Sequence, residues 1–161
     1  MRILGVDPGK DGGLAILQDG ELVGGIRMPT YELRGKAVVD GRKVIEWING
    51  DWSEYGVKGF DAAVIENVHA MPKQGVTSSF QFGRMLGGIE VTITSFGKPV
   101  HYVTPQQWKR AMGLSRDKQA SIDAAKVMFG SAADALIKRK ADEGISEAAL
   151  IAAYWRDKLG A

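Results

Sequence analysis

The sequence contains no cysteine and only two histidines among its 161 residues. Without cysteine, neither a disulfide framework nor a thiolate metal site is possible. Any bound metal ion would therefore have to be held by oxygen atoms or by histidine. The lack of cysteine also fits an intracellular protein, and we expect a cytoplasmic location.

Long apolar runs and a strong charge imbalance are also missing. No window approaches the about 18 uninterrupted apolar residues of a membrane span, and the first residues lack the pattern of a secretory signal. We therefore predict no membrane association. The formal net charge of +2 is too small to indicate nucleic-acid binding by itself, so the distribution of basic residues matters more than their total.

The bulk composition is that of an ordinary globular protein, with 45% hydrophobic and 25% charged residues. A chain of this length is the size of one domain and can bury roughly 70% of its unfolded surface. We find no internal repeat, low-complexity tract or clear linker, and the stretch 131–141 is the softest boundary. The sequence therefore predicts a single domain over residues 1–161.

Hydrophobic periodicity predicts a mixed order of strands and helices. Two apolar runs at 2–7 and 13–18 are separated by proline and glycines, which indicates a hairpin, and a third run at 22–28 extends it to an antiparallel meander. The next predicted element is a helix within 36–50, which has helical spacing from about Arg42 and is interrupted or capped near Asp40. The elements after it, in chain order, are a buried strand at 61–66, a long helix from Ser78 or Ser79 to about 96 with a serine cap, a short strand at 99–105, and helices at 106–113, 118–130 and 145–160. This order predicts an α/β fold with a mixed sheet.

Carboxylates stand at the ends of three of these elements. Asp7 ends the first strand, Glu66 ends the strand at 61–66, and Asp142, Glu143 and Glu147 surround the start of the last helix. Each has an ordinary explanation, because aspartate is common in turns, a strand-end glutamate is often solvated, and acids in a first helical turn complement the helix dipole. Two buried strands that both run directly into acids nevertheless place those acids side by side if the strands are neighbours.

Clustered carboxylates repel, so such a group signals either a shared proton or a hard divalent cation. Oxygen ligands without cysteine favour Mg²⁺, for which Mn²⁺ can substitute. Two such ions about 3.5–4 Å apart activate water and stabilise the leaving oxygen of a phosphodiester. The acids therefore predict a metal-dependent hydrolase.

Five segments in this order resemble the RuvC-like Holliday junction resolvases of the RNase H-like superfamily. They read "GVDPGKDGGLAI", "VIENV", "SSFQFGRMLGGIEV", "VTPQQWKRAMGLSRDKQAS" and "SEAALIAAYW". The resemblance implies an RNase H-like fold, in which a mixed five-stranded sheet begins with an antiparallel meander and has helices on both faces. It implies an endonuclease that resolves four-way DNA junctions in recombination and repair, using two metal ions per active site and leaving 5′-phosphate ends.

The resemblance also assigns catalytic, metal-binding roles to individual acids. Asp7 and Glu66 match the first two acids of the family, and Glu147 stands where the family has an aspartate. The fourth ligand precedes the last one by about one helical turn. Asp142 is the preferred candidate there, with Glu143 as the close alternative.

Several residues are candidates for contact with DNA. In the family, a side chain near the start of the loop after the second acid acts in opening the junction, and His69 or Met71 is the counterpart here. Basic residues near the site would offset the repulsion between acids and phosphates. The candidate DNA-binding residues are His69, Met71, Lys73, Gln74, Ser78, Ser79, Arg84, Lys109, Arg116, Lys118, Lys138, Arg139 and Lys140. Lys10 faces either DNA or water, with water preferred, and the apolar neighbours of Trp108 and Phe129 predict core positions.

A homodimer is implied by the resemblance, because a two-fold symmetric junction needs two active sites to cut opposing strands. A requirement for a branch-migration partner does not follow from the sequence. Three other functions fit parts of the pattern: an RNase H-like nuclease on other branched DNA or RNA-containing substrates, a junction-binding module without catalysis, and an ATP-binding actin-like domain. The last normally requires a second, related half that this chain lacks.

Overall fold

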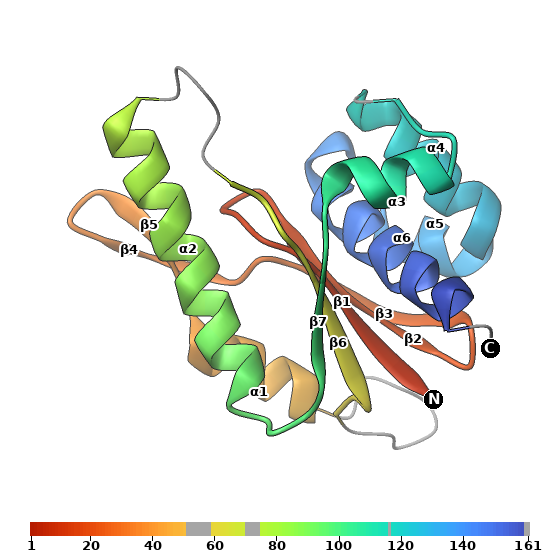
Figure 1. Ribbon diagram of the computed structural model, residues 1–161, viewed down its shortest axis with the longest axis horizontal. Coiled ribbons are helices and arrows are strands. Elements are labelled where there is room, and N and C mark those ends of the chain that lie inside the picture. Colours follow the sequence, from red (N-terminus) through yellow and green to blue (C-terminus); the bar gives the residue numbers. More distant parts are fainter. Residues whose placement is uncertain (51–58, 70–74, 116, 160–161) are drawn as a thin grey trace.

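The structure is a computed structural model that describes residues 1–50, 59–69, 75–115 and 117–159 (Figure 1). Its centre is a five-stranded sheet with the order β3-β2-β1-β6-β7. The strands are β1 (Arg2–Asp7), β2 (Gly13–Gln18), β3 (Glu21–Arg27), β6 (Ala62–Glu66) and β7 (Val100–Val103). β1, β2 and β3 form an antiparallel meander, whereas β6 and β7 run parallel to β1. The predicted mixed sheet is confirmed.

Helices cover both faces of this sheet, as predicted (Figure 1). One face carries α1 (Gly41–Asn49) and α2 (Val76–Thr94). The other carries α3 (Pro105–Ala111), α4 (Lys118–Phe129), α5 (Ser131–Leu136) and α6 (Glu143–Lys158), with a short 3₁₀ turn, η1 (Lys140–Asp142), before α6. No helix in the described part of the chain is both long enough and apolar enough to span a membrane.

The alternation of side chains along each strand divides the core in two. Leu4 and Val6 pack in the cluster under α1 and α2, whereas Ile3 packs in the cluster under α6. Because successive side chains point to opposite faces, Asp7 shares the α6 face with Ile3. The same alternation in β6 places Glu66 on the face of Val64, which belongs to the α6 cluster. Strand parity thus directs both acids toward α6.

Helix α6 lies unusually close to β1 and to the turn after it. A Cβ atom on Gly5 would lie 1.9 Å from the carbonyl oxygen of Ala148, and one on Gly144 would lie 2.3 Å from the carbonyl carbon of Gly12. Gly12 and Gly144 also form a parallel bridge. Glycine is required at these contacts because two backbones occupy the space that a side chain would need.

The main element missed from the sequence is a second, two-stranded sheet of β4 (Thr30–Leu33) and β5 (Lys36–Val39). Its two-residue turn consists of Arg34 and Gly35, both with positive φ, at 52° and 72°. Arginine is an uncommon residue for a tight hairpin turn of this kind, so the turn gave no strong signal. The following helix α1 begins as predicted, with the Asp40 side chain accepting a hydrogen bond from the Lys43 amide.

Two helix starts also differ from the predictions. The serine cap of α2 is wrong, because the helix begins at Val76 with Gly75 as its N-cap. Helix α6 begins at Glu143, two residues earlier than predicted. The stretch 131–141, which has the softest boundary signal in the sequence, contains α5 and the start of η1.

The close α6–β1 contact makes a direct stability prediction. Gly5→Ala should lower the free energy of unfolding by about 3 kcal/mol or more, because the added methyl group meets backbone atoms that cannot move aside. Gly83→Ala is the control: its Cβ meets nothing within 4 Å, and removal of a helical glycine should stabilise by about 0.5–1 kcal/mol. Urea denaturation of both variants measures the two free energies of unfolding. Equal values for Gly5→Ala and Gly83→Ala would contradict the close contact between Gly5 and α6.

Candidate active site

The first two acids meet at one edge of the sheet. β1 and β6 are parallel neighbours in which Val6 pairs with Ile65, so the next residues, Asp7 and Glu66, leave the two strands side by side. The carboxyl end of neighbouring parallel strands is a common place for a binding site. The structure therefore brings together the two acids that the sequence singled out at strand ends.

Helix α6 brings two further acids to the same place. Glu143 and Glu147 are four residues apart in its first turns, and each side chain is only 12% exposed. The bridge between Gly12 and Gly144 fixes the start of α6 beside the β1–β2 turn. Residues four apart share a helix face, and here that face is turned toward Asp7.

The electrostatics of Asp7 show how closely these groups lie. Burial raises the pKa of Asp7 well above its usual range, and the negative charges of Glu147, Glu66 and Glu143 raise it further. The pKa of Glu66 is also raised, first by burial and then by Glu147, while a hydrogen bond from Trp108 and the charge of Lys109 oppose the shift. The charges of Glu147, Glu66 and Glu143 therefore all act on the Asp7 carboxylate.

Two lysines balance part of this charge. Lys109 Nζ lies 2.6 Å from Glu147 Oε1, and Lys118 Nζ lies 2.7 Å from Glu143 Oε2. The hydrogen bond to Glu143 raises the pKa of Lys118. Both lysines were predicted to contact DNA, and the structure places both directly at the acids.

Two buried residues that orient the acids were missed as functional residues. Trp108 is fully buried, as predicted, but its indole Nε1 also donates a hydrogen bond of 2.7 Å to Glu66 Oε1. Ser121, fully buried in α4, donates one of 2.9 Å to Glu147 Oε1. A buried indole N–H or hydroxyl group needs a hydrogen-bond acceptor, so the predicted burial of Trp108 indicated that an acceptor exists. The sequence alone does not identify that acceptor.

The structure reverses the predicted preference for Asp142 over Glu143. Asp142 Oδ2 accepts hydrogen bonds of 3.1 Å from the backbone amides of Lys138 and Arg139. Arg139 Nε also approaches Asp142 Oδ1 at 3.7 Å. The η1 turn directs this carboxylate back into the preceding loop, and Asp142 is absent from the groups that shift the pKa of Asp7. The geometry therefore favours Glu143 as the fourth acid.

The donor set fits a hard divalent cation, because it consists of carboxylate oxygens in excess. Among the described residues, however, no three acidic or histidine side chains already converge on one point with the geometry to hold an ion. Lys109 and Lys118 hold Glu147 and Glu143 instead.

The other candidate DNA-binding residues lie on several elements of both sheet faces. His69 is exposed just beyond β6, Ser78 and Ser79 lie in the first turn of α2, and Arg84 is half-buried one turn further on. Exposed Lys138, Arg139 and Lys140 precede α6. Lys140 and Lys118 border, with Arg27 and Glu143, a cavity of about 200 Å³. The predicted residues Met71, Lys73, Gln74 and Arg116 lie outside the described residues.

Comparison with solved structures shows which fold this is. The chain is similar to RuvC of Thermus thermophilus in complex with a Holliday junction substrate, with 18% identity, a TM-score of 0.59, and 99% of this chain and 97% of that one covered. A second Thermus thermophilus RuvC structure gives 19% identity and a TM-score of 0.57, with 98% and 97% covered. The fowlpox virus Holliday junction resolvase gives 17% identity and a TM-score of 0.58, with 99% of both chains covered.

These similarities extend over almost the whole chain, so the protein has the RuvC-type, RNase H-like fold that the sequence led us to expect. No protein-family model and no curated protein sequence matches the chain. At this level of identity the likeness establishes the fold, and the assignment of chemistry depends on the residues of the site.

The hydrogen bond from Trp108 to Glu66 predicts a specific loss of stability. Trp108→Phe should lower the free energy of unfolding by about 1–3 kcal/mol beyond the cost of the smaller ring, because it leaves a buried carboxylate oxygen without its donor. Trp155→Phe is the matched control, since Trp155 Nε1 is buried without a hydrogen-bond partner among the described residues. The measurement is denaturant unfolding at neutral pH. Equal losses in the free energy of unfolding for Trp108→Phe and Trp155→Phe would contradict a stabilising role of the hydrogen bond to Glu66.

The raised pKa of Asp7 predicts that this residue costs stability at neutral pH. A raised folded pKa stabilises below the unfolded value of about 3.9, and this contribution is lost as the pH rises through the folded pKa. Asp7→Asn should therefore be more stable than the parent at pH 8 by about 1 kcal/mol or more, with the difference shrinking toward pH 4. Thermal melts of both proteins in a chelator, at several pH values, measure this difference. If the difference between Asp7→Asn and the parent did not change with pH, the charge repulsion at Asp7 would be contradicted.

Proposed function

We propose that this protein is a metal-dependent, structure-selective DNA endonuclease that resolves four-way junctions by paired hydrolysis of phosphodiester bonds, in DNA recombination and repair. The observation that carries the proposal is the convergence of Asp7, Glu66, Glu143 and Glu147 on one sheet edge in a fold shared with RuvC and the fowlpox resolvase. Repulsion among carboxylates lowers the stability of a protein without a bound cation, and it strengthens the binding of a cation that relieves it.

Mg²⁺, or Mn²⁺ in its place, is the proposed cofactor, with two ions per site held by Asp7, Glu66, Glu143 and Glu147. When bound, such ions activate water and stabilise the leaving oxygen of a phosphodiester. Trp108 and Ser121 fix the orientation of Glu66 and Glu147 through their hydrogen bonds, as outer-shell partners of metal ligands commonly do.

Lys109 and Lys118 would have a second role when DNA is present. Their ammonium groups now neutralise Glu147 and Glu143, and a cation at the acids would release them. A released lysine beside the site can neutralise a phosphate of the substrate. Lys138, Arg139 and Lys140 extend the positive charge along the loop before α6 and would hold the DNA further from the cut.

A homodimer is proposed because a four-way junction needs two cuts. The exposed side of α2 supports it: Phe80 and Val91 are 73% and 71% exposed, and Gly83 and Gly87 have open space where a Cβ would be. Small residues between exposed apolar ones allow a second helix to approach closely. The proposed substrate is therefore a two-fold symmetric junction held by two copies of the chain.

A cleavage panel tests the proposal with matched variants. The parent should cut a synthetic four-way junction in Mg²⁺ or Mn²⁺, leave 5′-phosphate ends, and be inactive in a chelator. Asp7→Asn and Glu143→Gln should lose cleavage by about 100-fold or more. Asp142→Asn should stay within a few-fold of the parent, because the amide oxygen of the new side chain still accepts hydrogen bonds from the loop amides. Junction binding in Ca²⁺ should persist in all three.

Other outcomes would redirect or reject the assignment. Preference for an RNA–DNA hybrid or for a simple fork over the four-way junction would replace the resolvase assignment with another RNase H-like nuclease. An Asp7→Asn variant that cleaves as fast as the parent would reject the acidic site itself.

A further inference from the structure

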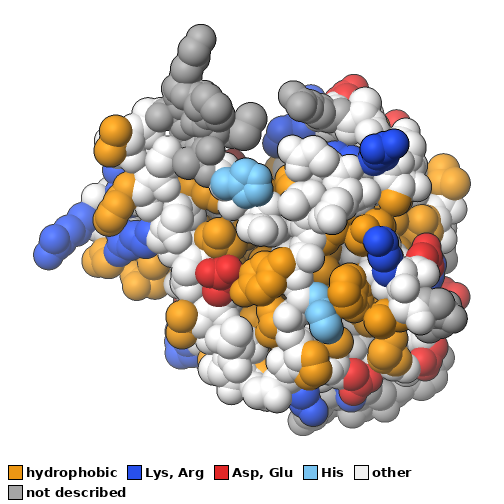
Figure 2. All heavy atoms as spheres, viewed as in Figure 1, with side chains coloured by type: hydrophobic (Ala, Val, Ile, Leu, Met, Phe, Trp, Pro, Cys, Tyr) orange, Lys and Arg blue, Asp and Glu red, His pale blue; other side chains and the backbone are white. Residues whose placement is uncertain are grey.

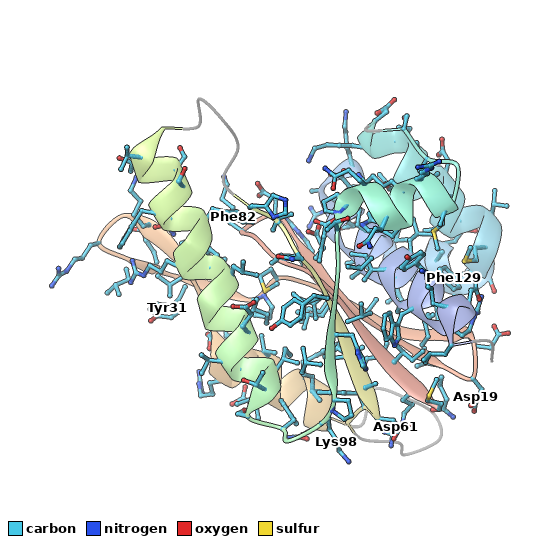
Figure 3. The ribbon with its side chains drawn as sticks, in the orientation of Figure 1. Asp19, Tyr31, Asp61, Phe82, Lys98 and Phe129 are labelled. Carbon is cyan, nitrogen blue, oxygen red and sulfur yellow. The ribbon has the colours of Figure 1, made fainter. Side chains whose placement is uncertain are left out.

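A groove lies on the opposite side of β1 from the acids, between the β4–β5 hairpin and the first half of α2. It has a volume of about 520 Å³, which lies within the range of small-molecule and cofactor sites. Its lining combines the hairpin end, the β1–β2 turn and the first turns of α2. In Figure 3, Phe82 marks the α2 side of this region and Tyr31 marks the hairpin strand β4.

Contacts between these three segments fix the shape of the groove. The Gln81 side-chain amide of α2 donates a hydrogen bond to the backbone carbonyl of Ala37 in β5. Further along, a Cβ on Gly88 would lie 3.4 Å from Val39, so helix and hairpin pack closely. A Cβ on Gly9, in the β1–β2 turn, would lie 3.8 Å from the Phe82 ring. The groove is thus preformed.

The chemistry of the lining points to a polyanion. Among the described residues that line it, two are lysines, Lys10 and Lys36, and none is acidic. Thr77 and Ser78 also line the groove, and serine and threonine hydroxyls commonly bind phosphate oxygens. Phe82 adds an apolar surface against which a sugar or base can pack.

The hairpin end adds a third cation, Arg34. Lys10 Nζ lies 3.6 Å from Asp11 Oδ2, in an exposed pair, whereas within the described part of the chain neither Arg34 nor Lys36 pairs with a carboxylate. Arg34 also holds a φ of 52°, a conformation that costs a non-glycine residue free energy. In Figure 2, basic side chains project from this side of the molecule. The hairpin therefore presents positive charge that the folded chain does not itself use.

The groove is continuous with the active site through the β1–β2 turn. Gly9 and Lys10 line the groove and follow Asp7 by two and three residues, so the β1–β2 turn borders both the acids and the groove. We propose that the groove binds the sugar-phosphate backbone of the substrate DNA beside the bond to be cut, with Lys10, Lys36 and Arg34 neutralising its phosphates. This inference rests on the proposed nuclease function and adds a DNA surface on the α2 face.

Salt-dependent binding tests the groove with a charge-matched control. Lys10→Gln/Lys36→Gln removes two charges from the lining, while Lys43→Gln/Lys98→Gln removes two elsewhere; Lys98 lies at the opposite end of α2 (Figure 3). With a four-way junction in Ca²⁺, the groove variant should flatten the slope of log affinity against log salt by about two units. Its affinity at moderate salt should fall about tenfold or more, and the control should match the parent.

A cross-link provides a second readout that does not depend on charge. Because the chain has no cysteine, Lys36→Cys and Lys98→Cys each introduce a single thiol. A junction that carries a disulfide-activated tether on a phosphate near the cleavage site should trap Lys36→Cys in high yield and Lys98→Cys only at background.

The outcomes separate this inference from the function on which it rests. If the parent neither binds nor cuts junctions, the proposed function fails. If the parent does both, but the groove variant keeps the parental salt slope and Lys36→Cys cross-links only at background, the groove inference is wrong. If the groove variant keeps its salt slope but shifts the dimer equilibrium in analytical ultracentrifugation, the surface binds a second copy of the chain and the inference is likewise overturned.

Discussion

The contact between α6 and β1 is the constraint on which the arrangement of the site depends. Glu143 and Glu147 reach Asp7 only because the backbone of α6 rests directly on Gly5 and on the turn at Gly12. Even a single methyl group at these positions would overlap with backbone atoms of the facing segment and push the helix away from β1. The buried alanines of α6, such as Ala148 and Ala152, serve the same close approach.

The same packing that assembles the acids also makes them repel. Burial and neighbouring charge raise the pKa of Asp7 and of Glu66, so the folded protein carries an electrostatic cost at neutral pH. Lys109 and Lys118 offset part of it through short ion pairs with Glu147 and Glu143. Active sites commonly contain groups that lower the stability of the folded protein when no ligand is bound, because the same groups bind a ligand of opposite charge.

Much of the fold and part of the site followed from local patterns. The meander, the position of β6, and the strand-end location of Asp7 and Glu66 were predicted because buried strands have a strong apolar signature that stops abruptly at the acid. The β4–β5 hairpin was not predicted, because its strands are short and its turn contains Arg34, where asparagine or glycine is usual. Glu143 was ranked below Asp142 because sequence spacing does not show that η1 turns Asp142 toward the amides of Lys138 and Arg139.

The order of amino acids alone established which groups the protein can offer: carboxylates at the ends of buried strands, and no thiolates. Which side chains act together became visible only in the folded chain. Trp108 reaches Glu66 from 42 residues away along the chain, and Ser121 reaches Glu147 from another helix. These pairings depend on the orientation of whole helices across the sheet, which arises from packing over the full core and leaves no local trace in the sequence.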